Sequence, residues 1–346
     1  EQGKPVIGFG AGEPDFPTPE YVVKDVQVAA EDTSNHKYSP VAGLTILKEE
    51  IVRTSKLYSG INVQQENILV SNGGKHAILT TFMSILNPGD EVLIPSPYWT
   101  TYPEAVKISG GNPIIVDTEF DDDFKVNTDQ LDALKTSKTK ILVWVSPSNP
   151  TGVVYTKEEA EKIYNWAFEN NVWILSDELY EHLVYEGMTS PSPAQYDTEL
   201  NNTIIINGVA KAYSMTGWRV GWIIANTDVI DMAKKIQSHA TSNVSNISQI
   251  AAYSALKNGL NETKIMKESF NRRRLYAIEE FSNIENVNLI KSTGAFYLFP
   301  DVSYYSSNGV INGVHNSIDF CNWLLDEYFI AFVPGEVFGK NGFLRC

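Results

Sequence analysis

The sequence has few cysteines and no long hydrophobic run. Only Cys321 and Cys346 occur among its 346 residues, too few for a disulfide framework or a CxxC metal site. This scarcity is typical of a reducing compartment, so we expect a cytoplasmic protein without a bound metal. Apolar runs such as residues 141–145 are far shorter than the roughly 18 residues of a membrane helix. We therefore expect no membrane partner.

Positive charge is also scarce. Lysine and arginine total 27 against 42 aspartates and glutamates, which gives a net charge of −15. Such a field repels phosphate backbones and anionic lipid surfaces, so nucleic acid is excluded as an expected partner. Apolar residues make up 43% of the chain, a proportion typical of folded proteins. At roughly 150 residues per domain, the length allows about two domains.

From about Asn67 onward, short apolar runs alternate with amphipathic helical patterns. This alternation predicts an α/β fold, with a mostly parallel, doubly wound sheet. One predicted helix begins at a capping box formed by Thr156 and Glu159. The predicted strands cover residues 68–71, 92–95, 114–117, 140–145, 172–175, 203–206 and 220–225.

The pattern changes after about Phe281. Short predicted strands at 287–290 and 295–299 accompany one helical stretch around 320–328, which indicates a smaller α+β domain. We expect a large domain over residues 25–265 and a discontinuous small domain made of residues 1–24 and 266–346. Three consecutive arginines, residues 272–274, are expected on a solvated helix face.

Polar residues follow several of the predicted strands. Because ligands of open parallel sheets bind beyond the carboxyl ends of the strands, we expect these residues to converge on one edge. They are Asn72 to Lys75, Pro97 to Trp99, Ser148 to Pro150, Asp177 with Tyr180, and Gly208 to Lys211.

Taken singly, each of these residues also has an ordinary structural interpretation. Gly73 and Gly74 stand at a strand-to-helix turn that exposes N–H groups suited to a phosphate, but the sequence matches neither a Walker loop nor a dinucleotide fingerprint. Asp177 follows an apolar strand, where a carboxylate needs a cationic or donating partner, although it could equally cap a helix over residues 178–182. The other three residues also have common structural roles: a turn residue for Asn149, a core aromatic for Trp99 and a surface charge for Lys211.

Together, however, these motifs resemble the class I aminotransferases of pyridoxal phosphate fold type I, in the bacterial aspartate aminotransferase branch. The resemblance covers essentially the whole chain. It is carried by residues 10–16, 37–43, 73–75, 97–99, 146–152, 176–181, 211–219 and 333–345.

The resemblance implies that pyridoxal 5′-phosphate is the cofactor. It implies that Lys211 holds the cofactor covalently and then moves the proton at the substrate Cα. Asp177 keeps the ring nitrogen protonated, Tyr180 and Asn149 bind the ring's phenolic oxygen, and Trp99 stacks on the ring face. A lysine in this role needs a lowered pKa, which a desolvated and cation-rich pocket provides.

The resemblance also assigns the anionic groups. Arg219 and the turn at Gly73 and Gly74 bind the cofactor phosphate, and Tyr38 reaches the same phosphate from a neighbouring subunit, so a homodimer is expected. Arg345, beside the Gly12 backbone, binds the α-carboxylate of the amino-acid or 2-oxo-acid substrate as a bidentate pair. Lys75 lies in the phosphate turn and binds the distal carboxylate of a dicarboxylic substrate; a purely structural role in that turn is its alternative. All of these residues are carried over from the family pattern.

Two departures from the family pattern stand out. Ala210 occupies the position before the lysine, where many relatives have a hydroxyl residue, so one phosphate hydrogen bond is not expected here. The chain also begins without a methionine and stops one residue after Arg345. The family continues beyond both points, so we expect the small domain to be truncated at both ends in this sequence.

The expected reaction is amino transfer from L-aspartate to 2-oxoglutarate by a ping-pong mechanism. A prephenate or broader aromatic and dicarboxylic aminotransferase is the first alternative, since the same two cations accept any substrate with two carboxylates. A carbon–sulfur lyase on the same scaffold is a second alternative. A non-catalytic ligand sensor is disfavoured, because Lys211 is present and no DNA-binding module is visible.

Overall fold

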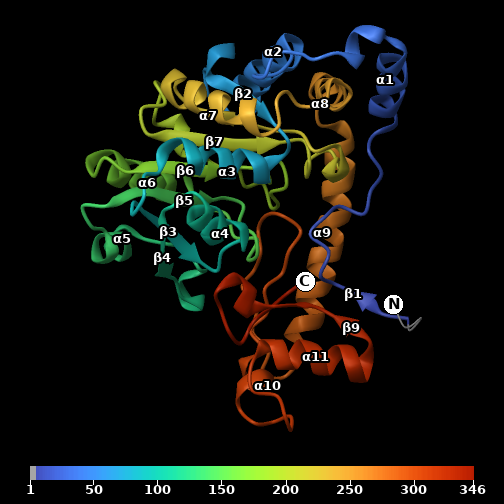
Figure 1. Ribbon diagram of the computed structural model, residues 1–346. Coiled ribbons are helices and arrows are strands. Elements are labelled where there is room, and N and C mark those ends of the chain that lie inside the picture. Colours follow the sequence, from blue (N-terminus) through green and yellow to red (C-terminus); the bar gives the residue numbers. More distant parts are fainter. Residues whose placement is uncertain (1–4) are drawn as a thin grey trace.

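A seven-stranded sheet forms the centre of the larger part of the molecule (Figure 1). The computed structural model describes residues 5–346. In the sheet the strand order is β2-β8-β7-β6-β5-β3-β4, and only β8 runs antiparallel to its neighbours. The strands are β2 (Ile68–Ser71), β3 (Glu91–Ser96), β4 (Asn112–Asp117), β5 (Thr139–Val145), β6 (Trp173–Asp177), β7 (Thr203–Gly208) and β8 (Gly221–Ile224). The predicted, mostly parallel α/β sheet is confirmed.

Both faces of the sheet are covered by helices, which explains why its central strands are mostly apolar. In β5, Ile141 and Val143 face one helical layer, while Leu142 and Trp144 face the other, as the two-residue period of a strand requires. One layer contains α3 (Gly74–Ile85), α4 (Thr101–Ile108) and α7 (Thr227–Ala240). The other contains α1 (Glu20–Glu31), α2 (Thr45–Thr54), α5 (Thr128–Leu134), α6 (Lys157–Glu169) and α8 (Asn246–Asn258).

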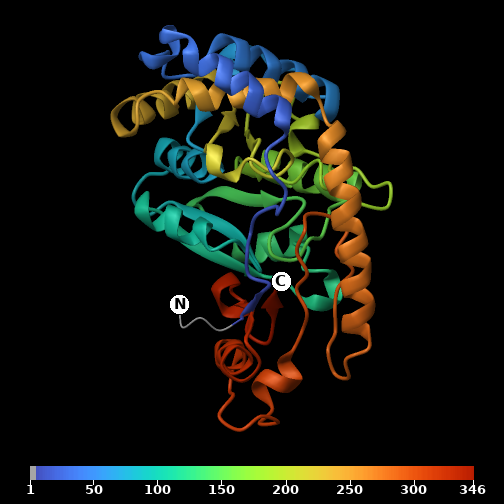
Figure 2. The same cartoon turned by 90° about the vertical axis from the view of Figure 1, so that its right-hand side faces the viewer.

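The smaller part is built from both ends of the described chain. The helix α9 (Asn261–Ser282) runs from the larger part into it (Figure 2). There β1 (Ile7–Gly8) pairs in parallel with β9 (Ile330–Ala331), and β10 (Val333–Pro334) pairs with β11 (Leu344–Arg345). Two further helices are α10 (Ser303–Ser307) and α11 (Ser317–Tyr328). The domain division at residues 25–265 stays a prediction, and residues 1–4 lie outside the described part.

Short helical turns join these elements. Six are 3-10 turns, and η2 (Ser55–Ser59) is a π-helical turn that directly follows α2. The 3-10 turns are η1 (Thr33–His36), η3 (Gln65–Asn67), η4 (Phe120–Asp122), η5 (Pro193–Gln195), η6 (Thr216–Trp218) and η7 (Gly335–Phe338). Within residues 5–346, no helix combines the length and the apolar composition of a membrane span.

The predicted capping box is confirmed. The Glu159 N–H donates to Thr156 Oγ1 over 3.2 Å, and the Thr156 N–H donates to Glu159 Oε2 over 2.6 Å. These two bonds satisfy donors that the first turn of α6 would otherwise leave unpaired. The local sequence therefore determines where α6 begins.

The structure corrects two predictions for the C-terminal third: the two short strands are wrong, and of the three arginines expected on a solvated face only Arg272 and Arg273 are exposed. Residues 287–290 and 295–299 form no regular strands. Asn288 makes an isolated bridge with Asp301, and Leu298 exchanges two backbone hydrogen bonds with Cys346. Ala295 has a φ of 54°, which interrupts an extended chain, and the apolar side chains around it are explained by burial. Arg274 is buried rather than solvated, since its Nη2 lies 2.8 Å from Glu186 Oε1 and its Nη1 donates to the Ser292 carbonyl.

Candidate active site

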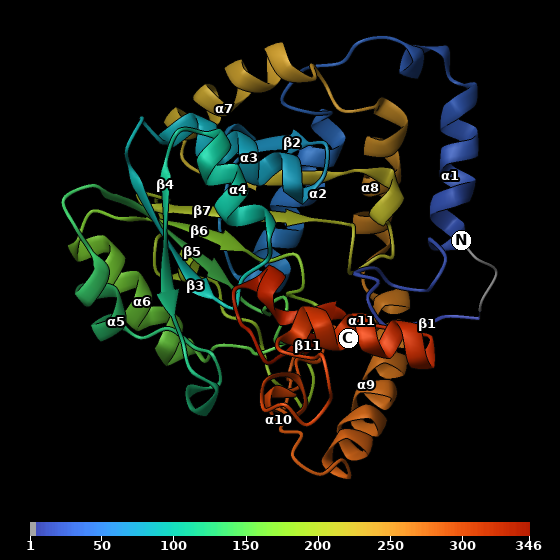
Figure 3. The ribbon, with the colours of Figure 1, turned by 60° about the horizontal axis from the view of Figure 1, so that its bottom comes forward.

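A cavity of about 320 Å³ lies at the edge of the sheet where the parallel strands end. The arrowheads of β5 and β6 point toward the C-terminal segment that closes this edge (Figure 3). Residues from the polar sets after β2, β3, β5, β6 and β7 all line the cavity, as predicted. Of the predicted site residues, those in the lining are Gly12, Gly74, Lys75, Trp99, Asn149, Asp177, Tyr180, Lys211, Arg219 and Arg345.

Asp177 is the last residue of β6 and is only 5% exposed. Its Oδ2 accepts a hydrogen bond from the Tyr102 hydroxyl over 2.7 Å, and its Oδ1 accepts one from the Leu179 N–H over 3.3 Å. Burial raises the Asp177 pKa to about 6, while the Tyr102 hydrogen bond opposes this rise. Residues 178–182 form turns and no helix, so the predicted alternative of a helix cap is wrong.

Lys211 lies in the turn that follows β7 and projects into the same cavity. Its Nζ donates to the Gly12 carbonyl over 2.5 Å. Burial lowers the Lys211 pKa to about 8, while the nearby Glu13 carboxylate raises it and Arg345 lowers it further. At this pKa roughly a tenth of the amine is unprotonated at pH 7, and this fraction can act as a nucleophile or a base.

The turn between β2 and α3 forms an anion cradle. Gly73 has a φ of +85°, and a Cβ at this position would lie 2.6 Å from Arg219 Nη2. The first N–H groups of α3, which begins at Gly74, have no partner within the helix. The Arg219 guanidinium, which also donates to the Thr216 carbonyl over 2.7 Å, lies against this turn. Helix N–H groups and a guanidinium together suit a phosphate.

Arg345 on β11 is 8% exposed. Its Nη1 donates to Asn149 Oδ1 over 3.2 Å and its Nη2 donates to the Gly10 carbonyl over 2.8 Å, while its Nε is buried without a partner. The guanidinium also lies 4.8 Å from the Tyr297 ring centroid. A buried guanidinium with an unused donor in a cavity wall is suited to bind a carboxylate.

Aromatic side chains complete the cavity. Trp99 is half-buried and meets the Tyr102 ring edge-on at 5.6 Å, and the Lys75 Nζ lies 5.0 Å from the Trp99 ring. The hydroxyls of Tyr180 and Tyr297 are 2.7 Å apart. Lys75 is exposed, so its charge is available to a ligand at the mouth of the cavity.

Tyr38 is the one predicted site residue that lies away from the cavity. Its side chain is 92% exposed, and it is absent from the lining of its own chain's cavity. Gly73 contributes through its contact with Arg219 rather than as a lining residue. The contribution of Tyr38 to a neighbouring subunit stays a prediction.

Sequence reasoning missed Tyr102 and Tyr297. Tyr102 follows Trp99 by only three residues, and a turn hydrogen bond from the Tyr102 N–H to the Trp99 carbonyl holds the two close together. Tyr297 stands in an irregular segment, where no periodicity indicates which way a side chain points. Only the tertiary structure brings Tyr297 to Tyr180, 117 residues away in the chain.

This donor set fits a phosphorylated aromatic aldehyde with a basic ring nitrogen. The amine of Lys211 matches the aldehyde, the buried carboxylate of Asp177 matches a protonated nitrogen, and the cradle at Gly73 matches the phosphate. The Arg345 guanidinium, with its remaining terminal N–H groups, is a separate donor for a carboxylate substrate.

Comparison with known proteins agrees with this geometry. The family model for aminotransferase class I and II matches residues 4–346. The aspartate aminotransferase of Streptomyces avermitilis is 46% identical over 345 residues, which cover 99% of this chain and 85% of the relative. The probable aspartate/prephenate aminotransferase of Aquifex aeolicus is 39% identical, over 99% of this chain and 86% of its own length. The crystal structure of the Rhizobium meliloti aspartate aminotransferase superposes with a TM-score of 0.93 at 36% identity, covering 99% and 87% of the two chains.

Proposed function

This chain belongs to the class I and class II aminotransferase family, and on that premise we propose that it transfers the amino group of L-aspartate to 2-oxoglutarate with pyridoxal 5′-phosphate as cofactor. One observation carries the proposal. A single cavity contains the Lys211 amine, the Asp177 carboxylate and the two cationic side chains of Lys75 and Arg345. A pocket for dicarboxylates needs local positive charge of this kind, most of all in a protein with a net charge of −15.

When bound, pyridoxal phosphate supplies an aldehyde that takes up the amino group and a ring that accepts the electrons released at the substrate Cα. The N–H groups at Gly74 and the Arg219 guanidinium would hold its phosphate. Asp177 would hold the protonated ring nitrogen, Tyr180 and Asn149 would bind the phenolic oxygen, and Trp99 would cover one ring face. All four side chains line the cavity.

Lys211 would act as the base at the substrate Cα. Its pKa of about 8 lets the amine take a proton and return it near neutral pH. The Gly12 carbonyl accepts a hydrogen bond from the Lys211 Nζ, and this contact gives the amine a defined position when it is protonated.

Arg345 would bind the α-carboxylate, and Lys75 the distal carboxylate. Arg345 lines the cavity, and each of its terminal nitrogens carries a second N–H beyond those that Asn149 and the Gly10 carbonyl accept, so a carboxylate in the cavity would accept from these donors. The Lys75 Nζ lies 5.0 Å from the Trp99 ring centroid, and both residues line the cavity, so the lysine charge would attract a second carboxylate bound there.

The site would be completed in a homodimer. Tyr38 is 92% exposed and lies outside its own chain's cavity, which supports a role across a subunit interface. In that arrangement its hydroxyl would add a donor to the phosphate bound at Gly74 and Arg219.

Prephenate is the second candidate substrate. The Aquifex aeolicus relative is named as a probable aspartate/prephenate aminotransferase, and prephenate also carries two carboxylates. The ratio of kcat/KM for aspartate to that for prephenate decides between the two activities.

The test is an absorbance spectrum of the purified protein with pyridoxal phosphate, followed during titration with aspartate alone. Conversion of the bound cofactor to its aminated form is expected, together with oxaloacetate in equal amount. Release of products without amination of the cofactor would identify a lyase instead. Lys211→Ala should abolish both the visible absorbance and the amino transfer, and normal turnover by this variant would refute the assignment of Lys211.

A further inference from the structure

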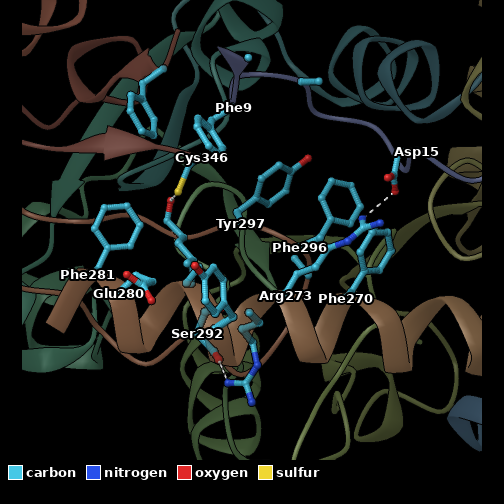
Figure 4. Close-up of a pocket in the computed structure, with 18 of the residues that line it drawn as sticks. Phe9, Asp15, Phe270, Arg273, Glu280, Phe281, Ser292, Phe296, Tyr297 and Cys346 are labelled. Carbon is cyan, nitrogen blue, oxygen red and sulfur yellow. Dashed lines mark hydrogen bonds and ion pairs between the residues drawn. The ribbon is translucent and has the colours of Figure 1, made fainter. Parts of the chain in front are cut away.

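Tyr297 forms part of the wall between two cavities. It lines the candidate active site and also a larger apolar cavity of about 600 Å³ that lies between α9, the segment 292–298 and the chain around Phe9 (Figure 4). Phe296 and Cys346 also line the larger cavity. The Tyr297 hydroxyl contacts Tyr180, which lines the candidate active site and not the larger cavity, so the polar end of Tyr297 lies on the active-site side.

The Tyr297 hydroxyl has few possible partners. It lies 2.7 Å from the Tyr180 hydroxyl and 3.5 Å from the Gly12 carbonyl. Both tyrosines are buried, with Tyr297 2% and Tyr180 6% exposed. Since water has little access, the two hydroxyls must satisfy each other or a ligand.

Each phenol has one hydrogen to donate, so the pair has two arrangements. In the first, Tyr180 donates to Tyr297, and Tyr297 donates to the distant Gly12 carbonyl. In the second, Tyr297 donates to Tyr180, and the Tyr180 hydrogen points into the cavity. An anionic acceptor in the cavity favours the second arrangement, because a hydrogen bond to a charged oxygen is stronger than one to a neutral oxygen.

The Tyr297 ring is held in place by its neighbours. It meets the Tyr180 ring edge-on at 5.6 Å and the Phe296 ring at 4.7 Å, and the Arg345 guanidinium lies 4.8 Å from its centroid. The hydroxyl therefore needs no further ordering before it donates to Tyr180.

We propose that Tyr297 is a positioning residue, whose hydroxyl donates to Tyr180 and so directs the Tyr180 hydrogen to the phenolic oxygen of the cofactor. The inference rests on the proposed function, in which Tyr180 binds that oxygen. Donation from Tyr297 makes Tyr180 the stronger donor, since hydrogen bonds in a chain polarise one another. The deprotonated form of the bound cofactor is thereby stabilised.

The experiment is a pH titration of the visible absorbance of the cofactor-loaded protein, for wild type and Tyr297→Phe. The variant keeps the ring and its packing and loses only the hydroxyl. The pH midpoint of the absorbance change should rise by about half to one unit, the equivalent of one modest hydrogen bond. Cofactor affinity, measured by reloading the stripped protein, should fall by roughly three- to tenfold.

Two further variants distinguish positioning from a structural role. In a Tyr180→Phe background, Tyr297→Phe should add no further shift, because the effect passes through Tyr180. Tyr185 is a matched control, since it is 2% exposed and donates to the Ala295 carbonyl in the same cluster. Tyr185→Phe should leave the absorbance midpoint unchanged.

An unchanged or lower midpoint in Tyr297→Phe would overturn the inference, as would an equal shift with and without Tyr180. If Tyr297→Phe does not fold, the same results are expected of Tyr297→Met, which also lacks the hydroxyl. The proposed function fails separately, when the wild-type protein itself takes up no pyridoxal phosphate or shows no visible absorbance.

Discussion

The Tyr102 hydroxyl donates to Oδ2 of Asp177 over 2.7 Å, and both side chains are buried. Tyr102 lies in the first turn of α4, and Trp99 precedes this helix, with its carbonyl accepting a hydrogen bond from the Tyr102 N–H over 3.1 Å. The short segment that leads into α4 therefore supplies both the aromatic side chain that lines the cavity and the shortest hydrogen bond to its buried carboxylate. Without that donor, burial alone would favour the neutral acid still more.

Tyr102→Phe should therefore impair the role of Asp177. Loss of this donor removes one of the groups that lower the Asp177 pKa, so the carboxylate is less readily ionised and holds the protonated ring nitrogen less well. We expect the acid limb of the kcat/KM profile to move to higher pH, and kcat to fall about tenfold. Steady-state kinetics from pH 5 to 9 measures both effects, with Tyr185→Phe as the control. A uniform loss at every pH would indicate a packing defect instead.

In the cofactor-free protein, the titration of Asp177 should make the free energy of unfolding depend on pH. Its pKa is raised from 3.8 to about 6 by burial, so between these values the folded state binds more protons than the unfolded state. The free energy of unfolding should therefore decrease as pH rises through this window, by up to about 3 kcal/mol.

Urea unfolding at pH 4 and pH 7 tests this expectation, with Asp177→Asn as the matched variant. Asparagine has nearly the same shape but no charge to bury. The decrease between the two pH values should be smaller in Asp177→Asn than in the wild-type protein. Equal decreases in both proteins would show that other groups govern this pH range.

Lys75→Ala should selectively lower kcat/KM for dicarboxylic substrates. The exposed lysine would lose its attraction for a distal carboxylate, and we expect kcat/KM for aspartate to fall about tenfold while alanine and phenylalanine change little. Lys257 also lies over an aromatic ring, 5.3 Å from Tyr253, so Lys257→Ala is a suitable control. An equal loss for all donors would assign Lys75 to the cofactor phosphate.

Gly73→Ala should loosen the phosphate cradle. The new Cβ would lie 2.6 Å from Arg219 Nη2 and would displace the guanidinium. Gly60→Ala is the control, because Gly60 also has a positive φ, of +70°, but has no heavy atom within 4 Å of the added Cβ. Gly60→Ala should lose about 1 kcal/mol of stability from backbone strain, and Gly73→Ala should lose more, because a φ of 85° with a ψ of 168° lies in a region open essentially to glycine alone. Only Gly73→Ala should also lose cofactor affinity, about tenfold by fluorescence titration, and similar affinities in the two variants would contradict this assignment.

Much of the fold was predictable because its signals are local. The strand at residues 68–71 was predicted with the observed bounds, since a short apolar run between polar residues has few other interpretations. The start of α6 followed from the side chains of Thr156 and Glu159 alone. By contrast, the apolar residues near Ala295 gave the same local signal as a strand, and only their backbone geometry and burial distinguish them.

The order of strands and helices along the chain could be predicted from the sequence, and so could the location of polar residues at the strand ends. Periodicity and capping depend only on neighbours within a few positions. The sequence also placed Asp177 and Lys211 at the same edge of the sheet, since parallel strands end together. The tertiary structure decided which side chains complete them. Tyr297 meets Tyr180 and Arg274 meets Glu186 only because distant segments pack together, and long-range packing leaves no periodic trace in the sequence.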